Sequence, residues 1–260
     1  MELNILRADP AGNITVFVLD PVEKAQRAAI AEKIMAIPAL KAEQVGYACA
    51  AEDDVDGHME MMGGEFCGNA TRAYGMYVAR KKGGLSSVRL RVSGCDHIVT
   101  AQVDCAKNTA SAEMPCPRSV SHVRAAGHEG TLVDLGGIAH FVVEGVAPSE
   151  DFFRAAEDIF AGIPALDACG VIFLDASEHR MTPLVKVIET GSLVWEGSCG
   201  SGSVACAVAQ SETLQNGGFS CDYRQPAGTV RASVERRNGA VIAARIGGPV
   251  TLDEVQCIEL

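Results

Sequence analysis

Several features that mark other protein classes are missing from this 260-residue sequence. No apolar run reaches the roughly 20 residues of a membrane span, and residues 1–4 lack the basic and apolar regions of a secretory signal peptide. Lys and Arg are fewer than Asp and Glu, 22 against 33. The resulting net charge of −11 argues against a nucleic-acid or anionic-membrane surface. These absences predict a cytoplasmic enzyme or binding protein.

The ten cysteines contain no Cys-x-x-Cys pair, the spacing typical of zinc and redox sites. A chain of this length also needs no disulfides to fold, so most of the cysteines are expected to be reduced, small core residues. A redox or metal-binding Cys-rich protein stays open as an alternative class, which stoichiometric zinc or iron in the purified protein would support. No Gly-x-Gly-x-x-Gly follows the strand predicted over 14–19, which leaves a dinucleotide site with little support.

Two of the cysteines stand in a repeated segment. Residues 67–71 (Cys-Gly-Asn-Ala-Thr) and 199–203 (Cys-Gly-Ser-Gly-Ser) match in type at every position, and each precedes an apolar stretch that predicts a helix. A helix N-terminus has unpaired N–H groups and the positive end of the dipole, which attract a carboxylate and lower the pKa of a thiol. We interpret the repeat as two thiols at two helix starts that face a shared cleft.

The remaining pattern predicts two similar halves. Helices are expected over 22–36, from Cys67 to about 82, over 149–160 and from Cys199 to about 209, the last with almost no polar residue over 202–209. Strands are expected over 14–19, 58–62, 88–92, 98–103, 131–143, 171–174, 184–188, 192–195, 230–236 and 241–246. This order is not that of a doubly wound sheet. It predicts an α+β fold with an N-terminal half, residues 1–114, joined by a C-terminal strand within 250–260, and a C-terminal half, residues 115–249.

A pair of thiols in one site suits the inversion of an amino-acid α-carbon. The reaction needs a base on one face of the carbon, an acid on the other, and stabilisation of the negative charge that develops on the carboxylate. A thiolate and a thiol supply the base and the acid, and the two helix ends supply the third requirement. No electron-sink cofactor is then needed, provided that water is excluded.

The two segments resemble the motifs of the diaminopimelate epimerase and proline racemase superfamily, cofactor-independent racemases with two catalytic cysteines. The resemblance extends along most of the chain. Its further matches are Gly12-Asn13, Gln44, Gly137-Ile138-Ala139-His140 at a Gly-Asn-Pro-His position, Trp195-Glu196, and the turn Pro226-Ala227-Gly228. Together the two cysteine motifs carry the resemblance.

The resemblance implies a role for each matched residue. Cys67 and Cys199 would be the two acid/base residues. The α-carboxylate would be bound by backbone N–H groups at Gly68, Asn69, Gly200 and Ser201, and the substrate would be contacted or oriented by Asn13, Gln44, His140 and Glu196. It also implies no cofactor and no metal, an amino acid as partner, a homodimer, and halves that are each a β-barrel-like sheet wrapped round a central helix.

The departures from diaminopimelate epimerases concern the far end of the substrate. Gly197 stands where those enzymes carry an Arg for the distal carboxylate, Ile138 replaces an Asn, and residues 61–64 (Met-Met-Gly-Gly) replace Asn-Ala-Asp-Gly. Buried polar groups discriminate strongly between substrates, so diaminopimelate fits poorly. Residues 196–202 (Glu-Gly-Ser-Cys-Gly-Ser-Gly) are similar to the histidine racemases of this superfamily.

Histidine is therefore the substrate that the sequence predicts. Besides the redox or metal-binding class named above, three alternatives remain open. One is a diaminopimelate epimerase or a racemase of another amino acid. The second is an isomerase of the same fold acting on another compound, although that branch generally lacks the cysteine pair. The third is an amino-acid-binding protein without activity.

Overall fold

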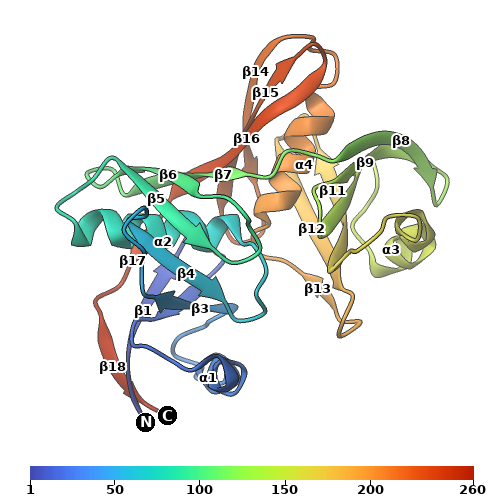
Figure 1. Ribbon diagram of the computed structural model, residues 1–260. Coiled ribbons are helices and arrows are strands. Elements are labelled where there is room, and N and C mark those ends of the chain that lie inside the picture. The colour runs from blue at the N-terminus through green and yellow to red at the C-terminus, as the bar shows by residue number, and fades with distance from the viewer. The chain divides into compact units, whose positions relative to one another are not determined.

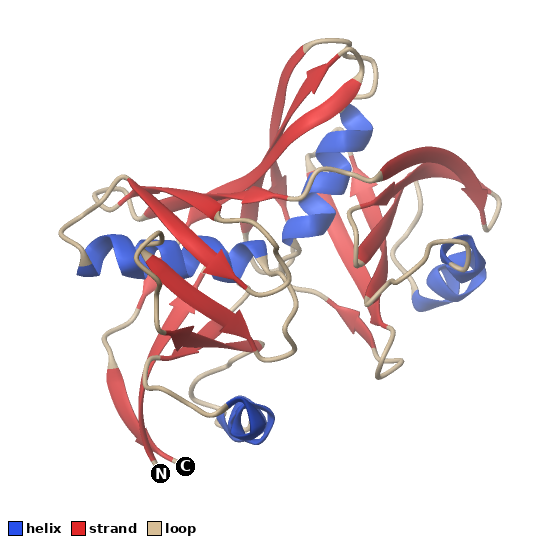
Figure 2. Cartoon of the chain, viewed as in Figure 1, coloured by secondary structure: helices blue, strands red, loops and turns tan.

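The computed structural model describes all residues, 1–260. It contains eighteen strands, four α-helices and two 3-10 helices, and strands make up most of the ordered chain (Figures 1 and 2). The chain forms two compact units, Met1–Glu113 with Gly247–Leu260, and Met114–Ile246. The predicted α+β class is confirmed.

The first unit is built from nine strands and three helical segments. Its elements are β1 (Glu2–Asp9), β2 (Thr15–Val18), η1 (Lys24–Gln26), α1 (Arg27–Met35), β3 (Gln44–Cys49), β4 (Gly57–Met61), α2 (Gly68–Lys81), β5 (Ser87–Val92), β6 (Val99–Asp104), β7 (Thr109–Met114), β17 (Thr251–Leu252) and β18 (Gln256–Glu259). Strand β1 pairs antiparallel with β2, β17 and β18. The pairs β2–β3 and β4–β5 are parallel, and β3–β4, β5–β6 and β6–β7 are antiparallel.

The two longer helices of this unit pack on opposite faces of its strands. Helix α2 contacts β4, β5, β6 and β17, and 11 of its 14 residues are buried. Side chains alternate along β2, so that Phe17 lies in the core around α2 while Val16 and Val18 lie in the core with Ile30 and Ile34 of α1. The helix that begins at Cys67 is thus the inner one, enclosed by strands.

The second unit has nine strands of its own. Its elements are β8 (Ser119–Ala125), β9 (His128–Asp134), β10 (Ile138–Glu144), α3 (Glu150–Ala156), η2 (Glu157–Phe160), β11 (Ala168–Asp175), β12 (Arg180–Val187), β13 (Leu193–Trp195), α4 (Gly200–Gln210), β14 (Gly217–Arg224), β15 (Thr229–Arg237) and β16 (Ala240–Pro249), whose last residues belong to the first unit. The pairs β8–β9, β9–β10, β11–β12, β12–β13 and β14–β15 are antiparallel, and β10–β11 is parallel.

Helices again lie on both faces of this second set of strands. Phe153 of α3 packs in one core with Phe141 of β10 and Val171 of β11. The residues next to these in the same strands point to the other face of the sheet. There His140 of β10 forms a hydrogen bond with Ser201 of α4, and Ile172 of β11 lies close to the backbone of α4. Helix α4 contacts β9, β10, β11, β14 and β15, and it is the buried helix predicted from its lack of polar residues.

The sequence misplaced one helix start and missed several strands. The helix predicted over 22–36 begins as a 3-10 turn at Lys24 and becomes α-helical only at Arg27, because no side chain caps either start. Strand β1 was not predicted, since Asn4 and Arg7 interrupt its apolar pattern. It forms by pairing with β18 at the other end of the chain, which no local pattern reveals.

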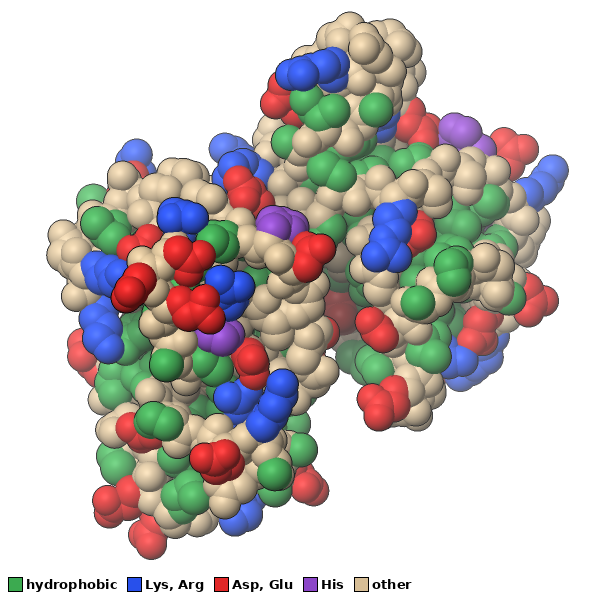
Figure 3. All heavy atoms as spheres, viewed as in Figure 1, with side chains coloured by type: hydrophobic (Ala, Val, Ile, Leu, Met, Phe, Trp, Pro, Cys, Tyr) green, Lys and Arg blue, Asp and Glu red, His purple; other side chains and the backbone are tan.

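Charged side chains are spread over the face of the molecule that Figure 3 shows. Acidic and basic side chains are interspersed there, with neither sign forming a continuous field. None of the helices combines the length and the apolar character needed to cross a bilayer.

Candidate active site

Cys67 and Cys199 are the N-cap residues of α2 and α4, as the predicted helix starts required. Both have extended backbones, with φ of −126° and −115°. Each sulfur accepts a hydrogen bond from the backbone N–H three residues on, Ala70 N at 3.4 Å and Gly202 N at 3.3 Å. N-cap residues are usually Ser, Thr, Asp or Asn, and cysteine is unusual there. At both helices the cysteine sulfur therefore lies beside backbone N–H groups that have no partner within the helix.

A hydroxyl four residues after each cysteine fixes its carbonyl. Thr71 Oγ1 donates to the carbonyl of Cys67 at 2.8 Å, and Ser203 Oγ donates to that of Cys199 at 2.7 Å. Both hydroxyls are fully buried. This contact explains why the repeated segment carries Thr or Ser at that position.

Two of the predicted site residues converge on Cys67. The Gln44 side-chain amide lies 3.3 Å from Cys67 Sγ, and it also donates to Asn13 Oδ1 at 2.8 Å and to Thr15 Oγ1 at 2.8 Å. The parallel register of β2 and β3 sets Thr15 directly beside Gln44. Asn13 follows a turn at residues 11–12, whose Gly12 has a φ of 94°, a conformation that glycine adopts without strain.

A buried arginine, Arg72, holds the loop around Cys67 together. Its Nε donates to Asn69 Oδ1 at 3.1 Å, and its other nitrogens donate to the carbonyls of Pro10 at 2.8 Å and Pro249 at 2.9 Å. The side chain is fully buried, which lowers its pKa to about 10, so the guanidinium stays charged at neutral pH. The signal in the sequence is that Arg72 is the one charged residue among the small and apolar residues of 68–79.

Around Cys199 the polar contacts form a chain. Ser201 Oγ lies 3.5 Å from Cys199 Sγ and 2.8 Å from His140 Nε2. His140 is fully buried, its Nδ1 has no partner, and burial lowers its pKa to about 3, so the ring is neutral at neutral pH. His140 therefore lies behind Ser201. Glu196 acts on the Cys199 sulfur directly, through its charge and a hydrogen bond.

Gln225 holds the segment that carries Cys199, and the sequence did not single it out. Its Oε1 accepts from the backbone N–H of Cys199 at 2.7 Å, and its Nε2 donates to Ser203 Oγ at 2.9 Å. The turn that follows is also attached to this segment, because Ala227 N donates to the carbonyl of Gly197 at 2.9 Å. The predicted Pro-Ala-Gly turn at 226–228 was the signal, since Gln225 directly precedes it.

The acidity of the two thiols differs from the expectation for a helix start. Burial raises the pKa of Cys67, and the N–H of Ala70 and the Gln44 amide offset this only in part. Burial and the Glu196 carboxylate raise the pKa of Cys199 well above its ordinary value, against a smaller effect of Ser201. Desolvation thus outweighs the helix dipole, and both cysteines are thiols at neutral pH.

Amides, hydroxyls and backbone N–H groups, which bind carboxylates, surround both sulfurs. The groups of Cys, His and carboxylate side chains that could share a metal ion lie elsewhere, at Cys49, His58 and Glu60 and at Cys95, Asp96 and His97. The first of these groups was not visible in the spacing of the sequence, because the fold brings residue 49 beside residues 58 and 60.

Comparisons with known proteins agree on one group of enzymes. The family model described as "Histidine racemase CntK N-terminal domain" matches residues 2–254. The histidine racemase of Fusobacterium nucleatum subsp. nucleatum is 33% identical over 215 residues, which cover 78% of each chain.

Solved structures share the fold at low sequence identity. A predicted epimerase from Pseudomonas aeruginosa is 13% identical with a TM-score of 0.69, covering 100% of this chain and 99% of its own. A hydroxyproline epimerase from Agrobacterium vitis with bound trans-4-hydroxy-L-proline is 12% identical with a TM-score of 0.62, covering 99% and 92%. These likenesses show the fold.

Proposed function

This chain belongs to the histidine racemase family, and we propose that it interconverts L- and D-histidine with Cys67 and Cys199 as the two acid/base residues and without a cofactor. The observation that carries the proposal is the pair of thiols that cap α2 and α4, each with a polar side chain, the Gln44 amide or the Ser201 hydroxyl, within hydrogen-bonding distance of its sulfur. The enzyme is an isomerase.

In each direction one cysteine removes the α-proton and the other supplies a proton to the opposite face of the carbon. Both cysteines are thiols in the resting protein, so the cysteine that acts as the base first releases its proton to water. The thiolate then takes up the substrate proton and becomes a thiol, while the thiol that donates becomes a thiolate. Acid and base exchange roles, no atom is consumed, and the enzyme is left ready for the reverse reaction. Each cysteine is the base for one enantiomer.

The negative charge that develops beside the α-carbon is spread into the substrate carboxylate, and the helix starts are suited to hold it. The first backbone N–H groups of α2 and α4, at residues 68–69 and 200–201, have no partners within their helices. Gly68 and Gly200 leave the backbone accessible because they carry no side chain. Donors placed where charge develops stabilise a transition state more than a ground state.

The two thiols carry different donors, and we assign them different means of becoming a base. The Gln44 amide shares its two hydrogens among Asn13 Oδ1, Thr15 Oγ1 and the Cys67 sulfur, which holds it in place beside that sulfur. Cys199 depends on the Ser201 hydroxyl, which can turn. The buried Nδ1 of His140 has no hydrogen-bond partner. Leaving a buried N–H without an acceptor costs more free energy than leaving a buried acceptor without a donor, so Nδ1 carries no hydrogen. The His140 proton is therefore assigned to Nε2.

With that assignment His140 donates to Ser201 Oγ, and the Ser201 hydroxyl is left to donate to the Cys199 sulfur. His140 is then a positioning residue that acts through Ser201. This contact opposes the effects of burial and of Glu196, which both favour the neutral thiol. Glu196 is in turn suited to receive the ammonium group of the amino acid beside Cys199.

Three further features of the enzyme are proposed. The parallel pair β2–β3 with α1 between its strands, and the pair β10–β11 with α3 between them, each precede a helix that begins at Cys-Gly. This supports two pseudo-symmetric halves, each a sheet curved around its inner helix, with the boundaries near 114 and 250. We also propose a homodimer, and a reducing compartment such as the cytoplasm because the mechanism needs free thiols.

Hydrogen exchange at the α-carbon tests the function. The protein is incubated in deuterium oxide with L-histidine, without pyridoxal phosphate, and deuterium at Cα and D-histidine are followed together. Both are expected to appear, and Cys67→Ser and Cys199→Ser are each expected to lose racemisation by orders of magnitude while staying folded. Activity on meso-diaminopimelate with none on histidine would overturn the substrate, and no exchange with any amino acid would overturn the reaction.

A further inference from the structure

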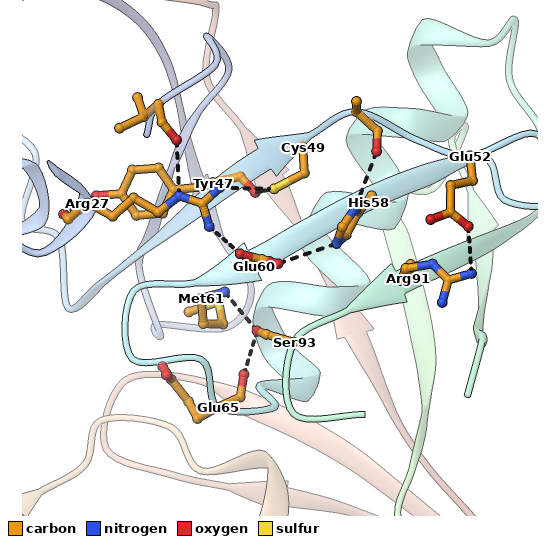
Figure 4. Close-up of polar contacts among 12 residues, drawn as sticks. Arg27, Tyr47, Cys49, Glu52, His58, Glu60, Met61, Glu65, Arg91 and Ser93 are labelled. Carbon is orange, nitrogen blue, oxygen red and sulfur yellow. Dashed lines mark hydrogen bonds and ion pairs between the residues drawn. The ribbon is translucent and has the colours of Figure 1, made fainter. Parts of the chain in front are cut away.

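Away from the two cysteine-capped helices, one face of the β3–β4 pair gathers three metal-ligating side chains. Cys49 lies directly opposite His58 in the antiparallel register, and Tyr47 lies opposite Glu60. Alternate residues of a strand share a face, so these four side chains lie on the same side (Figure 4). One ligand atom each of Cys49, His58 and Glu60 lies within 4.8 Å of the other two.

The imidazole of His58 is oriented as metal-binding histidines are. Its Nδ1 lies 3.3 Å from the carbonyl of Ala50, which can only accept, so the neutral ring carries its hydrogen on Nδ1. Nε2 then has a free lone pair, and it lies 3.8 Å from Glu60 Oε1. His58 Nε2 and Glu60 Oε1, both acceptors, therefore face each other with no hydrogen between them. The Ala50 carbonyl fixes the orientation of the ring through Nδ1, and histidines that bind a metal usually make such a second contact.

The cluster already attracts a cation, the guanidinium of Arg27. Arg27 pairs with Glu60 Oε2, lies 3.4 Å from Cys49 Sγ and stacks over the Tyr47 ring at 5.1 Å (Figure 4). This pairing uses Cys49 and one oxygen of Glu60. Glu60 Oε1 and His58 Nε2 stay outside it. The guanidinium thus occupies part of the cluster as a tethered positive charge.

We propose that Cys49, His58 and Glu60 form a binding site for a divalent transition-metal ion of the zinc class, with Arg27 as the competing cation. Sulfur, imidazole nitrogen and carboxylate oxygen are the donors of zinc sites, and water completes the fourth position. Metal binding releases the Cys49 proton. The thiolate and the carboxylate then balance the charge of the ion, so Arg27 loses its counter-charge and moves away from Glu60.

Cobalt(II) provides a spectroscopic test, because a thiolate ligand gives it a charge-transfer absorption band. The full chain carrying Cys67→Ser and Cys199→Ser is used, so that the proposed catalytic thiols do not compete. One equivalent of Co²⁺ is expected to bind with the band, to release one proton, and to be displaced by Zn²⁺. No band, or no saturation at one equivalent, would mean an ion-pair network only and would overturn the site.

Variants locate the ligands. Cys49→Ser is expected to abolish the band and weaken binding at least tenfold, and His58→Gln is expected to weaken it by a similar factor. Cys95→Ser is the matched control, because Cys95 belongs to the more exposed group with Asp96 and His97, and it is expected to change nothing. A band that survives Cys49→Ser, or disappears in Cys95→Ser, would place the metal elsewhere.

A separate variant tests whether Arg27 competes with the metal ion. Arg27→Gln is expected to tighten Co²⁺ binding several-fold, since it removes the competing charge and keeps a polar side chain. Unchanged or weaker binding would overturn the competition. Far-ultraviolet circular dichroism of each variant establishes that the comparison is between folded proteins, and the two ligand variants allow the site to be tested even if one of them fails to fold.

Discussion

In each of the two cysteine segments, the residue two positions after the cysteine forms a hydrogen bond with a fully buried basic side chain. Arg72 bonds to Asn69, the second residue after Cys67, and His140 bonds to Ser201, the second residue after Cys199. These second residues supply backbone N–H groups in the proposed carboxylate site. The arginine is charged and the histidine is neutral, so the same position is held in two chemically different ways.

Removing the Ser201 hydroxyl should affect one direction of racemisation more than the other. Ser201→Ala leaves the Cys199 sulfur without its side-chain donor, so the pKa of this thiol is expected to rise further. A hydrogen bond to a charged group is worth about 1.5–3 kcal/mol, or roughly a ten- to hundredfold loss of kcat/KM. The enantiomer for which Cys199 is the base should show this loss, together with a pH profile displaced to alkaline pH.

The measurement is kcat/KM against pH, started separately from L- and D-histidine. Ser201→Thr, which keeps the hydroxyl, is the control and should retain most of the activity. Equal losses in both directions with unshifted pH profiles would contradict the assigned role of Ser201.

Arg72 is expected to matter for stability as much as for activity. Arg72→Met preserves much of the volume but leaves the carbonyls of Pro10 and Pro249 and the Asn69 side chain without their donor. Each buried group left unpaired costs about 1–3 kcal/mol, so a loss of roughly 3 kcal/mol or more in the free energy of unfolding is expected. Urea denaturation measures it. Arg89→Met, at an exposed position of β5, is the control and should change stability by less than about 0.5 kcal/mol.

At the scale of elements, each cysteine is carried by a helix that strands enclose, and α2 approaches β6 closely. A Cβ placed on Gly75 would lie 2.8 Å from the Cβ of Ala101 and 3.3 Å from Val88 Cγ2. The Ala101 atom is attached directly to the backbone of β6, so it cannot rotate away. Glycine at this position therefore sets the distance between the helix and the strand.

Gly75→Ala should destabilise the protein although alanine favours helices. Overpacking costs about 1–3 kcal/mol, against a gain of roughly 1 kcal/mol in helix propensity. A net loss is expected, and the midpoint of urea unfolding measures it. In the double variant Gly75→Ala with Ala101→Gly the clash is relieved, so the two changes should destabilise less together than their sum. If the losses in the free energy of unfolding of the two single variants simply add in the double variant, the predicted clash between Gly75→Ala and Ala101 is contradicted.

For the whole molecule, buried titratable groups predict that stability declines on both sides of neutrality. His140 has a pKa of about 3 when folded, against 6.5 ordinarily, so only the unfolded chain takes up this proton between those values. Stability is thus lost as the pH falls below about 6.5. Burial raises the pKa of Cys67, Cys199 and Cys206 above 9.0, so only the unfolded chain releases these protons readily, and stability is lost as the pH rises above about 9.

Urea unfolding across the pH range tests both limbs. His140→Gln should flatten the acid limb, and Cys206→Ala, a change in the core of α4, should reduce the slope of the alkaline limb. An acid limb that is equally steep without His140 would assign the decline to other groups.

The sequence by itself determined the two helix starts at Cys-Gly, because capping and the onset of a helix depend on neighbouring residues. It also determined the α+β class and, by resemblance, predicted Asn13 and Gln44 as substrate-contacting residues; their place beside Cys67 came from the structure. These signals are local in the chain or lie in short motifs.

Tertiary structure alone decided how those thiols behave. Arg72 reaches carbonyls 62 and 177 residues away, Gln225 reaches Cys199 across 26 residues, and the fold brings Cys49 beside His58 and Glu60. The pKa of both cysteines was predicted in the wrong direction. A helix dipole can be read from the sequence, whereas desolvation depends on what the rest of the chain packs around the sulfur, and here desolvation is the larger effect.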